Sequence, residues 1–183
     1  MAESQGEGEA ASRGQRAGGR GPQGEGERRM TIIAWSGDLD RVWPQLIIAT
    51  TGAAFGMQVT VFFTFWGLFV LKRPDVHITG DNWMTRMMSA MNRGSTDHLP
   101  MSRMHFAGMG PKMMKTITEQ HKVASPTELL DTAREMGVRL WPCGMTMDLM
   151  GLTSADLVAD LPAPVGAASA VAEMQKSQIN LFI

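Results

Sequence analysis

The chain has 183 residues, with 17 Lys and Arg against 18 Asp and Glu, so its formal net charge is −1. A chain with this charge balance gives no sign of the clustered basic residues that nucleic-acid binding requires. The only cysteine, Cys143, excludes a disulfide within one chain and a metal site built from cysteines alone. One thiol fits a reducing compartment, and we expect a cytoplasmic protein.

The first 29 residues differ in composition from the rest. They hold eight Gly, five Glu and five Arg, with no aromatic or β-branched residue. Such a segment buries too little apolar surface to offset the entropy of ordering it. We therefore expect 1–29 to be a disordered tail and 30–183 to be a single domain. The tail lacks the apolar stretch of a signal peptide, and we expect Met30 to be the true or an alternative start of translation.

The domain begins with alternating strand and helix patterns. Residues 30–35 are a short apolar run that predicts a buried strand. A helix is predicted from about 41 to 55, with Asp38 or Asp40 as its cap. Residues 57–64 (MQVTVFFT) are rich in β-branched and aromatic residues and predict a second strand. Strand, helix and strand in this order predict a βαβ unit with a parallel strand pair.

An uncharged stretch of 26 residues, 46–71, is long enough to raise the alternative of a membrane-spanning helix. Gly52, Gly56 and Gln58 interrupt it, and the composition changes to β-branched and aromatic residues after Gly56. This change of pattern favours a helix followed by a core strand. We therefore expect no membrane contact.

The middle of the chain is rich in methionine. Methionines at 84, 87, 88 and 91 recur with helical spacing and predict an amphipathic helix over 82–92. Residues 93–110 are punctuated by glycine and proline and predict an irregular segment. A further helix is predicted from Pro111 towards Gln120.

The last third again alternates between helix and strand. The segment Ser125-Pro126-Thr127-Glu128 is a strong helix start signal, and the helix is predicted to end at Met136. Residues 138–141 predict a third strand. The remaining predicted elements are short helical pieces over 146–150 and 154–159, a helix over 166–175 and a strand over 179–183. The alternation predicts an α/β domain with a mostly parallel sheet.

Cys143 follows the predicted strand 138–141 and precedes the predicted helix 146–150. In open α/β sheets, ligands and reactive groups gather at the carboxyl ends of the strands. A thiolate beside a helix N-terminus is stabilised by free N–H groups, which favours a partly exposed nucleophile at Cys143. The alternative is a buried cysteine that packs as a small hydrophobe, and position alone leaves both readings open.

Five segments carry a family resemblance. They are 33–40 (IAWSGDLD), 61–68 (VFFTFWGL), 91–94 (MNRG), 97–100 (DHLP) and 143–151 (CGMTMDLMG). Together they resemble the DsrE/DsrF-like sulfur-relay family, most of all its DsrE-like branch that is often labelled peroxiredoxin-like. The resemblance covers about residues 30–183, and its specificity rests on the second and fifth segments taken together.

The resemblance implies a flavodoxin-like three-layer α/β sandwich with a mostly parallel sheet. It also implies a homo-oligomer, a trimer or hexamer, that hands sulfane sulfur between a rhodanese-type donor and a TusA-like carrier. We expect no cofactor. The sulfur-bearing cysteine of the family corresponds to Cys143. Some relatives carry a second cysteine, which this chain lacks. Transfer between two thiols of one subunit is therefore not expected here.

The function predicted from these observations is that of a sulfur carrier or sulfurtransferase-like relay protein. Cys143 would hold sulfane sulfur as a persulfide and pass it to an acceptor thiol. Ser36, Gly37 and Asp38 end the first strand and Gly144 follows the cysteine, so these four are predicted binding residues at the same edge of the sheet. Loop and capping roles are the alternative for them. The alternative function is a non-catalytic small-ligand-binding or regulatory protein in which Cys143 lines a pocket.

Thirteen of the 17 methionines lie between residues 84 and 150. With His98, His105 and Cys143 they raise the alternative of a soft-metal site, because thioether and thiolate ligands favour Cu(I). Their helical spacing favours a core or subunit interface instead, and we expect no metal. His98 beside Asp97 is an alternative acid/base pair. The apolar loop 101–109 adds to the methionine face, and both predict self-association.

Overall fold

Four parallel strands form one sheet in the computed structural model, which describes residues 27–76, 99, 116 and 123–183. The predicted helices over 82–92 and 111–120 and the loop 101–109 lie outside the described residues. The elements are β1 (Arg29–Ala34), α1 (Leu39–Ala54), β2 (Gln58–Phe63), the 3₁₀ helix η1 (Phe65–Leu71), α4 (Pro126–Glu135), β3 (Arg139–Pro142), α5 (Gly144–Met150), the 3₁₀ helix η3 (Ser154–Asp156), α6 (Ala167–Met174) and β4 (Ile179–Phe182).

The strand order is β3-β2-β1-β4, and each described pair of neighbours runs parallel. In the register, Ile32 of β1 lies between Val61 of β2 and Leu181 of β4. Such a sheet requires crossover helices, and the predicted βαβ unit is present as β1, α1 and β2. The predicted α/β fold with a flavodoxin-like sandwich is confirmed.

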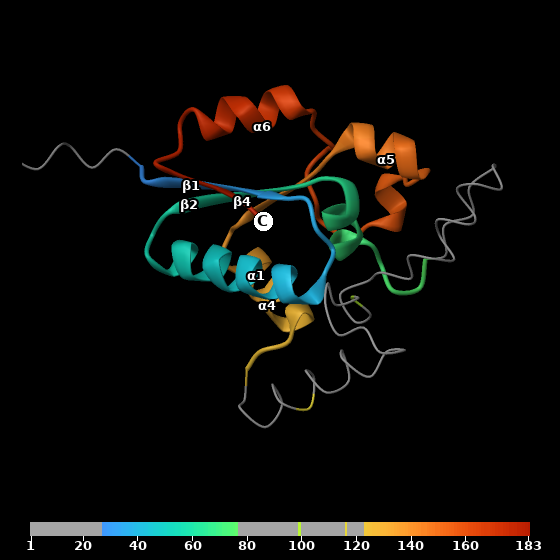
Figure 1. Ribbon diagram of the computed structural model, residues 1–183, viewed down its shortest axis with the longest axis horizontal. Coiled ribbons are helices and arrows are strands. Elements are labelled where there is room, and N and C mark those ends of the chain that lie inside the picture. Colours follow the sequence, from blue (N-terminus) through green and yellow to red (C-terminus); the bar gives the residue numbers. More distant parts are fainter. Residues whose placement is uncertain (1–26, 77–98, 100–115, 117–122) are drawn as a thin grey trace, which may run out of the picture.

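Helices cover both faces of the sheet, which makes three layers. Figure 1 shows α1 and α4 on one face and α6 on the other. Ile32, Val61 and Leu140 belong to the main apolar core, which also includes residues of α1 and α4. Their strand neighbours Ile33 and Phe62 face the other way and pack with Ala170 of α6. Because both faces of β1 and β2 are buried, these strands read as continuous apolar runs rather than as alternating ones.

Helix α1 begins at Leu39, two residues earlier than predicted. Asp38 occupies the N-cap position, but its carboxylate makes no side-chain cap bond to the helix. Asp40 lies in the first turn, where a negative charge interacts favourably with the helix dipole. Gly56 follows the helix with φ +73°, a left-handed conformation that favours glycine.

The uncharged stretch 46–71 divides among three elements. It contains the end of α1, the whole of β2 and η1. The prediction of a helix followed by a core strand is therefore confirmed, although η1 was not predicted. Within the described ranges, no helix is both long and apolar enough to cross a membrane.

The sheet begins one residue before the domain boundary that the composition predicts. Arg29 is the first residue of β1, and its guanidinium lies 2.8 Å from the carboxylate of Glu27. Its side chain also reaches Glu173 of α6 at 3.5 Å. Arg29 therefore belongs to the folded domain, whereas residues 1–26 lie outside the described part of the chain.

Candidate functional site

The carboxyl ends of β1, β2 and β3 bring three loops to one edge of the sheet. Figure 1 shows α5 and η1 together at this end. Trp35–Asp38 follow β1, Thr64 follows β2, and Cys143 follows β3. This is the edge at which open α/β sheets bind ligands, so the topology agrees with the predicted position of the site.

Cys143 is fixed at the junction between β3 and α5. It occupies the N-cap position of α5 with extended backbone, φ −80° and ψ 113°. Its N–H donates to the carbonyl of Phe63 in β2 at 3.0 Å, and its carbonyl accepts from the N–H of Met147 at 3.0 Å. Hydrogen bonds to the sheet on one side and to the helix on the other therefore hold the backbone of the cysteine.

The thiol is buried rather than partly exposed as predicted. Cys143 is 2% exposed and packs with Ile33, Phe62 and Ala170 on the face of the sheet that α6 covers. Trp141, Val165 and Met174 are partly buried against this cluster. The expectation of an exposed thiol was wrong because the chain returns over β3 after α5, which local sequence signals do not reveal.

The segment that returns is 162–166, which pairs with the end of β3. Val165 forms an isolated parallel bridge with Cys143. The N–H of Val165 donates to the carbonyl of Pro142 at 2.9 Å, and its carbonyl accepts from the N–H of Gly144 at 3.0 Å. The N–H of Gly144 is thus engaged by this segment and does not point to an open site.

The loop after β1 lies two strand positions from Cys143, because β2 separates β1 from β3. The hydroxyl of Ser36 donates to the carboxylate of Asp38 at 3.1 Å and accepts from the N–H of Asp38 at 3.2 Å. A Cβ on Gly37 would lie 2.6 Å from the carbonyl oxygen of Trp66. These contacts give the three residues a structural role in the loop, and their role in binding remains a prediction.

A pair of threonines that was not predicted joins the loop after β2 to α5. The hydroxyls of Thr64 and Thr146 lie 3.1 Å apart, and the N–H of Phe65 donates to the Thr146 hydroxyl at 3.2 Å. Thr146 is 1% exposed. Both threonines fall in the two segments that made the family resemblance specific, which was the available signal for them.

Four exposed apolar side chains surround this junction, and we call them the apolar rim. They are Phe65 and Trp66 of η1 and Met145 and Leu149 of α5, with exposed fractions between 41% and 64%. Met145 and Leu149 are four residues apart and share one face of α5. The apolar rim therefore lies next to the strand ends that carry Cys143 and Thr64.

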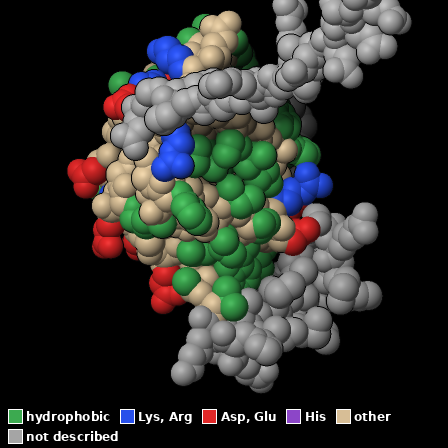
Figure 2. All heavy atoms as spheres, turned by 90° about the vertical axis from the view of Figure 1, so that its left-hand side faces the viewer, with side chains coloured by type: hydrophobic (Ala, Val, Ile, Leu, Met, Phe, Trp, Pro, Cys, Tyr) green, Lys and Arg blue, Asp and Glu red, His purple; other side chains and the backbone are tan. Residues whose placement is uncertain are grey.

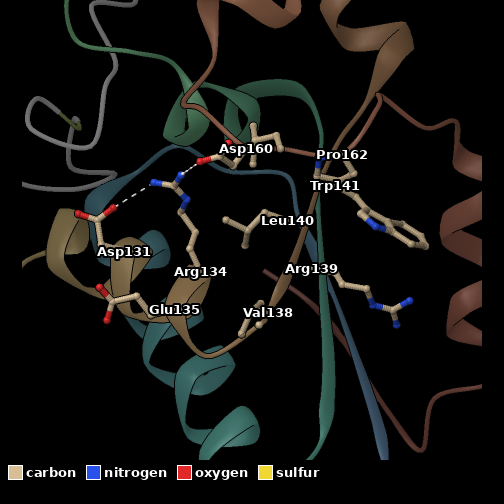
Figure 3. Close-up of a pocket in the computed structure, with 11 residues that line it drawn as sticks. Asp131, Arg134, Glu135, Val138, Arg139, Leu140, Trp141, Asp160 and Pro162 are labelled. Atoms are coloured by element: carbon tan, nitrogen blue, oxygen red, sulfur yellow. Dashed lines mark hydrogen bonds and ion pairs between the residues drawn. The ribbon is translucent and has the colours of Figure 1, made fainter.

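A hollow of about 840 Å³ lies beside β3, on the side away from β2. Figure 3 shows Arg134 of α4 between two carboxylates in this hollow. Its guanidinium lies 3.4 Å from Asp131 and 3.6 Å from Asp160. Cys143 is not among the lining residues, so the hollow does not support the prediction of a pocket lined by the thiol.

The other predicted candidates fall largely outside the described residues. All four histidines lie there, and so do most of the methionines between 84 and 150. Within the residues that the structure covers, no group of three or more His, Cys, Asp or Glu could hold a metal ion.

The fold and the site together define the class of protein. It is an α/β protein with a parallel sheet, and its single thiol lies at the carboxyl edge of that sheet, beside the start of a helix. Comparison with known families makes the assignment more particular. The model of the DsrE/DsrF/DrsH-like family matches residues 26–182, and the chain belongs to this family. The resemblance predicted from the five segments is therefore confirmed.

Two relatives are similar over almost their full lengths. The chain is 38% identical over 159 residues to a Bacillus subtilis (strain 168) protein named Uncharacterized protein YrkE, which covers 87% of this chain and 99% of the relative. It is 35% identical over 160 residues to the Sulfur carrier protein DsrE2 of Allochromatium vinosum, which covers 86% of this chain and 99% of the relative. The similarity thus spans the whole described domain rather than a single motif.

Proposed function

We propose that this chain is a sulfur carrier that holds sulfane sulfur as a persulfide on Cys143. Cys143 is the only thiol of the chain and lies at the carboxyl edge of the sheet, and this observation carries the proposal. Membership of the DsrE/DsrF/DrsH-like family and the similarity to a relative named as a sulfur carrier support it.

The proposed chemistry is two thiol–persulfide exchanges without net oxidation. The Cys143 thiolate attacks the outer sulfur of a donor persulfide, a new S–S bond forms, and the donor leaves as a thiolate. An acceptor thiolate then attacks the outer sulfur on Cys143, and the cysteine leaves as a thiolate. Each step forms one S–S bond and breaks one, so no oxidant is needed.

Donor and acceptor must be other molecules, because the chain has no second thiol to resolve the persulfide. We propose a rhodanese-type donor and a TusA-like acceptor in the cytoplasm. The apolar rim supports a contact site at this edge, since exposed apolar groups beside a reactive residue are typical of interaction surfaces. A trimer or hexamer remains part of the proposal.

Intact-mass measurement after incubation with glutathione persulfide tests the carrier function. The wild type should gain the mass of one sulfur atom, and a reducing thiol should remove it. Cys143→Ser should gain nothing under the same conditions. Wild-type protein that takes up no sulfur would contradict the proposal.

The burial of the thiol favours one second candidate, a non-catalytic binding or regulatory protein in which Cys143 only packs. In that case the native protein should take up no sulfur, whereas the denatured chain should. The intact-mass measurement, carried out on native and on denatured protein, therefore separates the two functions.

A further inference from the structure

The sulfur of Cys143 lies beneath one identifiable part of the chain. On its face of the sheet the cysteine packs with Ala170 of α6, with Met174 and with Val165 of the segment 162–166. We call α6 together with 162–166 the cover. Since Cys143 is 2% exposed, a donor persulfide cannot reach it while the cover is in place.

The cover has a small apolar contact with the sheet. Of the eight residues of α6, only Ala170 and Glu173 are buried, and Val171 points to solvent with 54% exposure. Stabilisation by apolar burial scales with the area removed from water, and alanine offers little. Apolar packing alone therefore holds α6 weakly compared with α1, which buries large side chains such as Trp43 and Leu46.

Glu173 supplies the main polar contact between α6 and the sheet. It is 5% exposed, and its carboxylate pairs with Arg29 of β1 at 3.5 Å and with Arg139 of β3. The guanidinium of Arg139 also lies over the ring of Trp141, 5.4 Å from the ring centroid, which is within the reach of about 6 Å of a cation–π contact. A buried carboxylate is costly unless it is paired. Because Glu173 belongs to α6 and both arginines belong to strands, lifting α6 off the sheet would break both ion pairs.

One end of the cover is attached lightly enough for a local movement. At one end, Val165 is attached by single backbone hydrogen bonds to Pro142 and Gly144, and Gly166 has no neighbour within 4 Å of a Cβ position. The other end is anchored to β1: the hydroxyls of Ser177 and Thr31 lie 2.7 Å apart, and the N–H of Gln178 donates to the carbonyl of Arg29 at 3.1 Å. Opening from the 162–166 end would break the two backbone bonds of Val165, the ion pairs of Glu173 and the packing of Ala170, and it would leave the core between the sheet and α1 intact.

We propose that the cover opens to expose Cys143 and that the Glu173 ion pairs hold it closed. This inference rests on the proposed function for its biological meaning, because it states how sulfur reaches the carrier thiol. Exposure of the thiol can nevertheless be measured with any thiol reagent. If the cover opens but the protein accepts no sulfane sulfur, the carrier function is contradicted and the inference about the cover is not.

The test compares the rate at which an aromatic disulfide reagent labels Cys143 in wild type, Glu173→Gln and Glu27→Gln. Glu27 pairs with the same Arg29 but lies outside α6, so Glu27→Gln is the matched control. Glu173→Gln should label at least about tenfold faster, because the loss of one bond to a charged group already shifts an equilibrium by about that factor. The control should label at the wild-type rate. Equal rates in all three proteins, or wild-type labelling as fast as in denaturant, would overturn the inference.

Hydrogen exchange separates local opening from global unfolding. Peptides from α6 and 162–166 should exchange faster in Glu173→Gln, while peptides from β1 and β2 should be unchanged. Faster exchange throughout the sheet would contradict a local cover. If Glu173→Gln does not fold, the wild type alone tests the inference. The labelling rate of its Cys143 should equal the opening rate that hydrogen exchange gives for the α6 amides, and it should exceed the opening rate of the β2 amides.

Discussion

Gly67 and Gly144, both near the carboxyl edge of the sheet, differ in the space available for a Cβ atom. A Cβ on Gly67 would lie 2.2 Å from the carbonyl oxygen of Ala34, which is closer than any real contact allows. A Cβ on Gly144 would lie 3.5 Å from the Cβ of Pro164, an ordinary contact. Gly67 is therefore required by the packing of η1 against β1, whereas Gly144 is not required by packing.

Gly67→Ala should lower the free energy of unfolding by about 2 kcal/mol or more, because backbone has to move to accommodate the methyl group. Gly144→Ala should change it by less than about 1 kcal/mol, since alanine fits and favours the helix. Urea unfolding of both variants measures the difference. Equal stability of the two variants would show that the loop after β1 adapts freely to η1.

Lys72 is a buried cation directly after η1. Its ammonium donates to the carbonyls of Val76 at 2.7 Å and Arg73 at 3.3 Å. Burial lowers the pKa of Lys72 below the usual 10.5. Between the folded and unfolded pKa values the unfolded chain binds more protons, so the free energy of unfolding rises with pH in this window.

The wild type should therefore gain stability relative to Lys72→Met as the pH rises towards 10.5 from below. Other titrating groups are common to both proteins, so the difference between the two isolates Lys72. Urea unfolding at several pH values measures it. Two stability curves that stay parallel over this range would contradict the lowered pKa.

For Cys143, the sequence predicts the position in the fold but not the surroundings of the side chain. The position of Cys143 at a strand end was predicted from the apolar run before it and the helix pattern after it. Its burial was one of two alternatives that position left open, and the role of Glu173 was not predicted, because both depend on contacts with residues 22 to 144 positions away along the chain. No local pattern encodes such contacts.

At the scale of elements, α4 shows how a start signal works. Ser125 accepts from the N–H of Glu128 at 3.2 Å, and the N–H of Ser125 donates to the Glu128 carboxylate at 2.7 Å. This hydrogen bond to the backbone of Ser125 lowers the pKa of Glu128. The predicted helix start signal is confirmed: its residues form a capping box, and α4 begins at Pro126.

Ser125→Ala should lower the free energy of unfolding by about 1 kcal/mol, since it leaves an N–H of the first turn without its partner. Ser169→Ala, an exposed serine in α6, serves as the control and should change stability by less than about 0.5 kcal/mol. Thermal or urea unfolding measures both. A Ser125→Ala variant as stable as the control would show that solvent replaces the cap.

Elements with strong local signals were predicted and η1 was not. The strands β1 and β2 and the helix α4 have clear apolar runs or capping residues. η1 has an apolar sequence, FWGLFVL, that local rules do not distinguish from strand. Its geometry depends on Phe65 at φ +46° and on the approach of Gly67 to Ala34, which are both tertiary features.

The whole molecule leaves apolar groups in contact with solvent at both ends of the sheet. The apolar rim lies at the carboxyl end. At the other end, Phe55 and Met136 precede strands and Ile179 begins one, and all three are exposed. Figure 2 shows hydrophobic side chains gathered on this face. Contiguous exposed apolar surface is typical of interaction sites.

Self-association is the prediction that follows at this scale. Light scattering across a micromolar dilution series should report more than one subunit, since most oligomers bury such surfaces in symmetric contacts. The methionines first predicted to form the interface, Met88 and Met104, lie outside the described residues. A monomer at every concentration would contradict the prediction.

Transfer of labelled sulfur to an acceptor measures the proposed carrier function itself. The protein is loaded with heavy-isotope sulfane sulfur, freed of donor and mixed with a TusA-like acceptor, and both intact masses are followed. If Cys143 carries sulfane sulfur, the acceptor should gain the heavy sulfur while Cys143 returns to the free thiol, and Cys143→Ser should transfer none. Loaded protein that keeps its sulfur, or an acceptor that gains sulfur equally from Cys143→Ser, would contradict it.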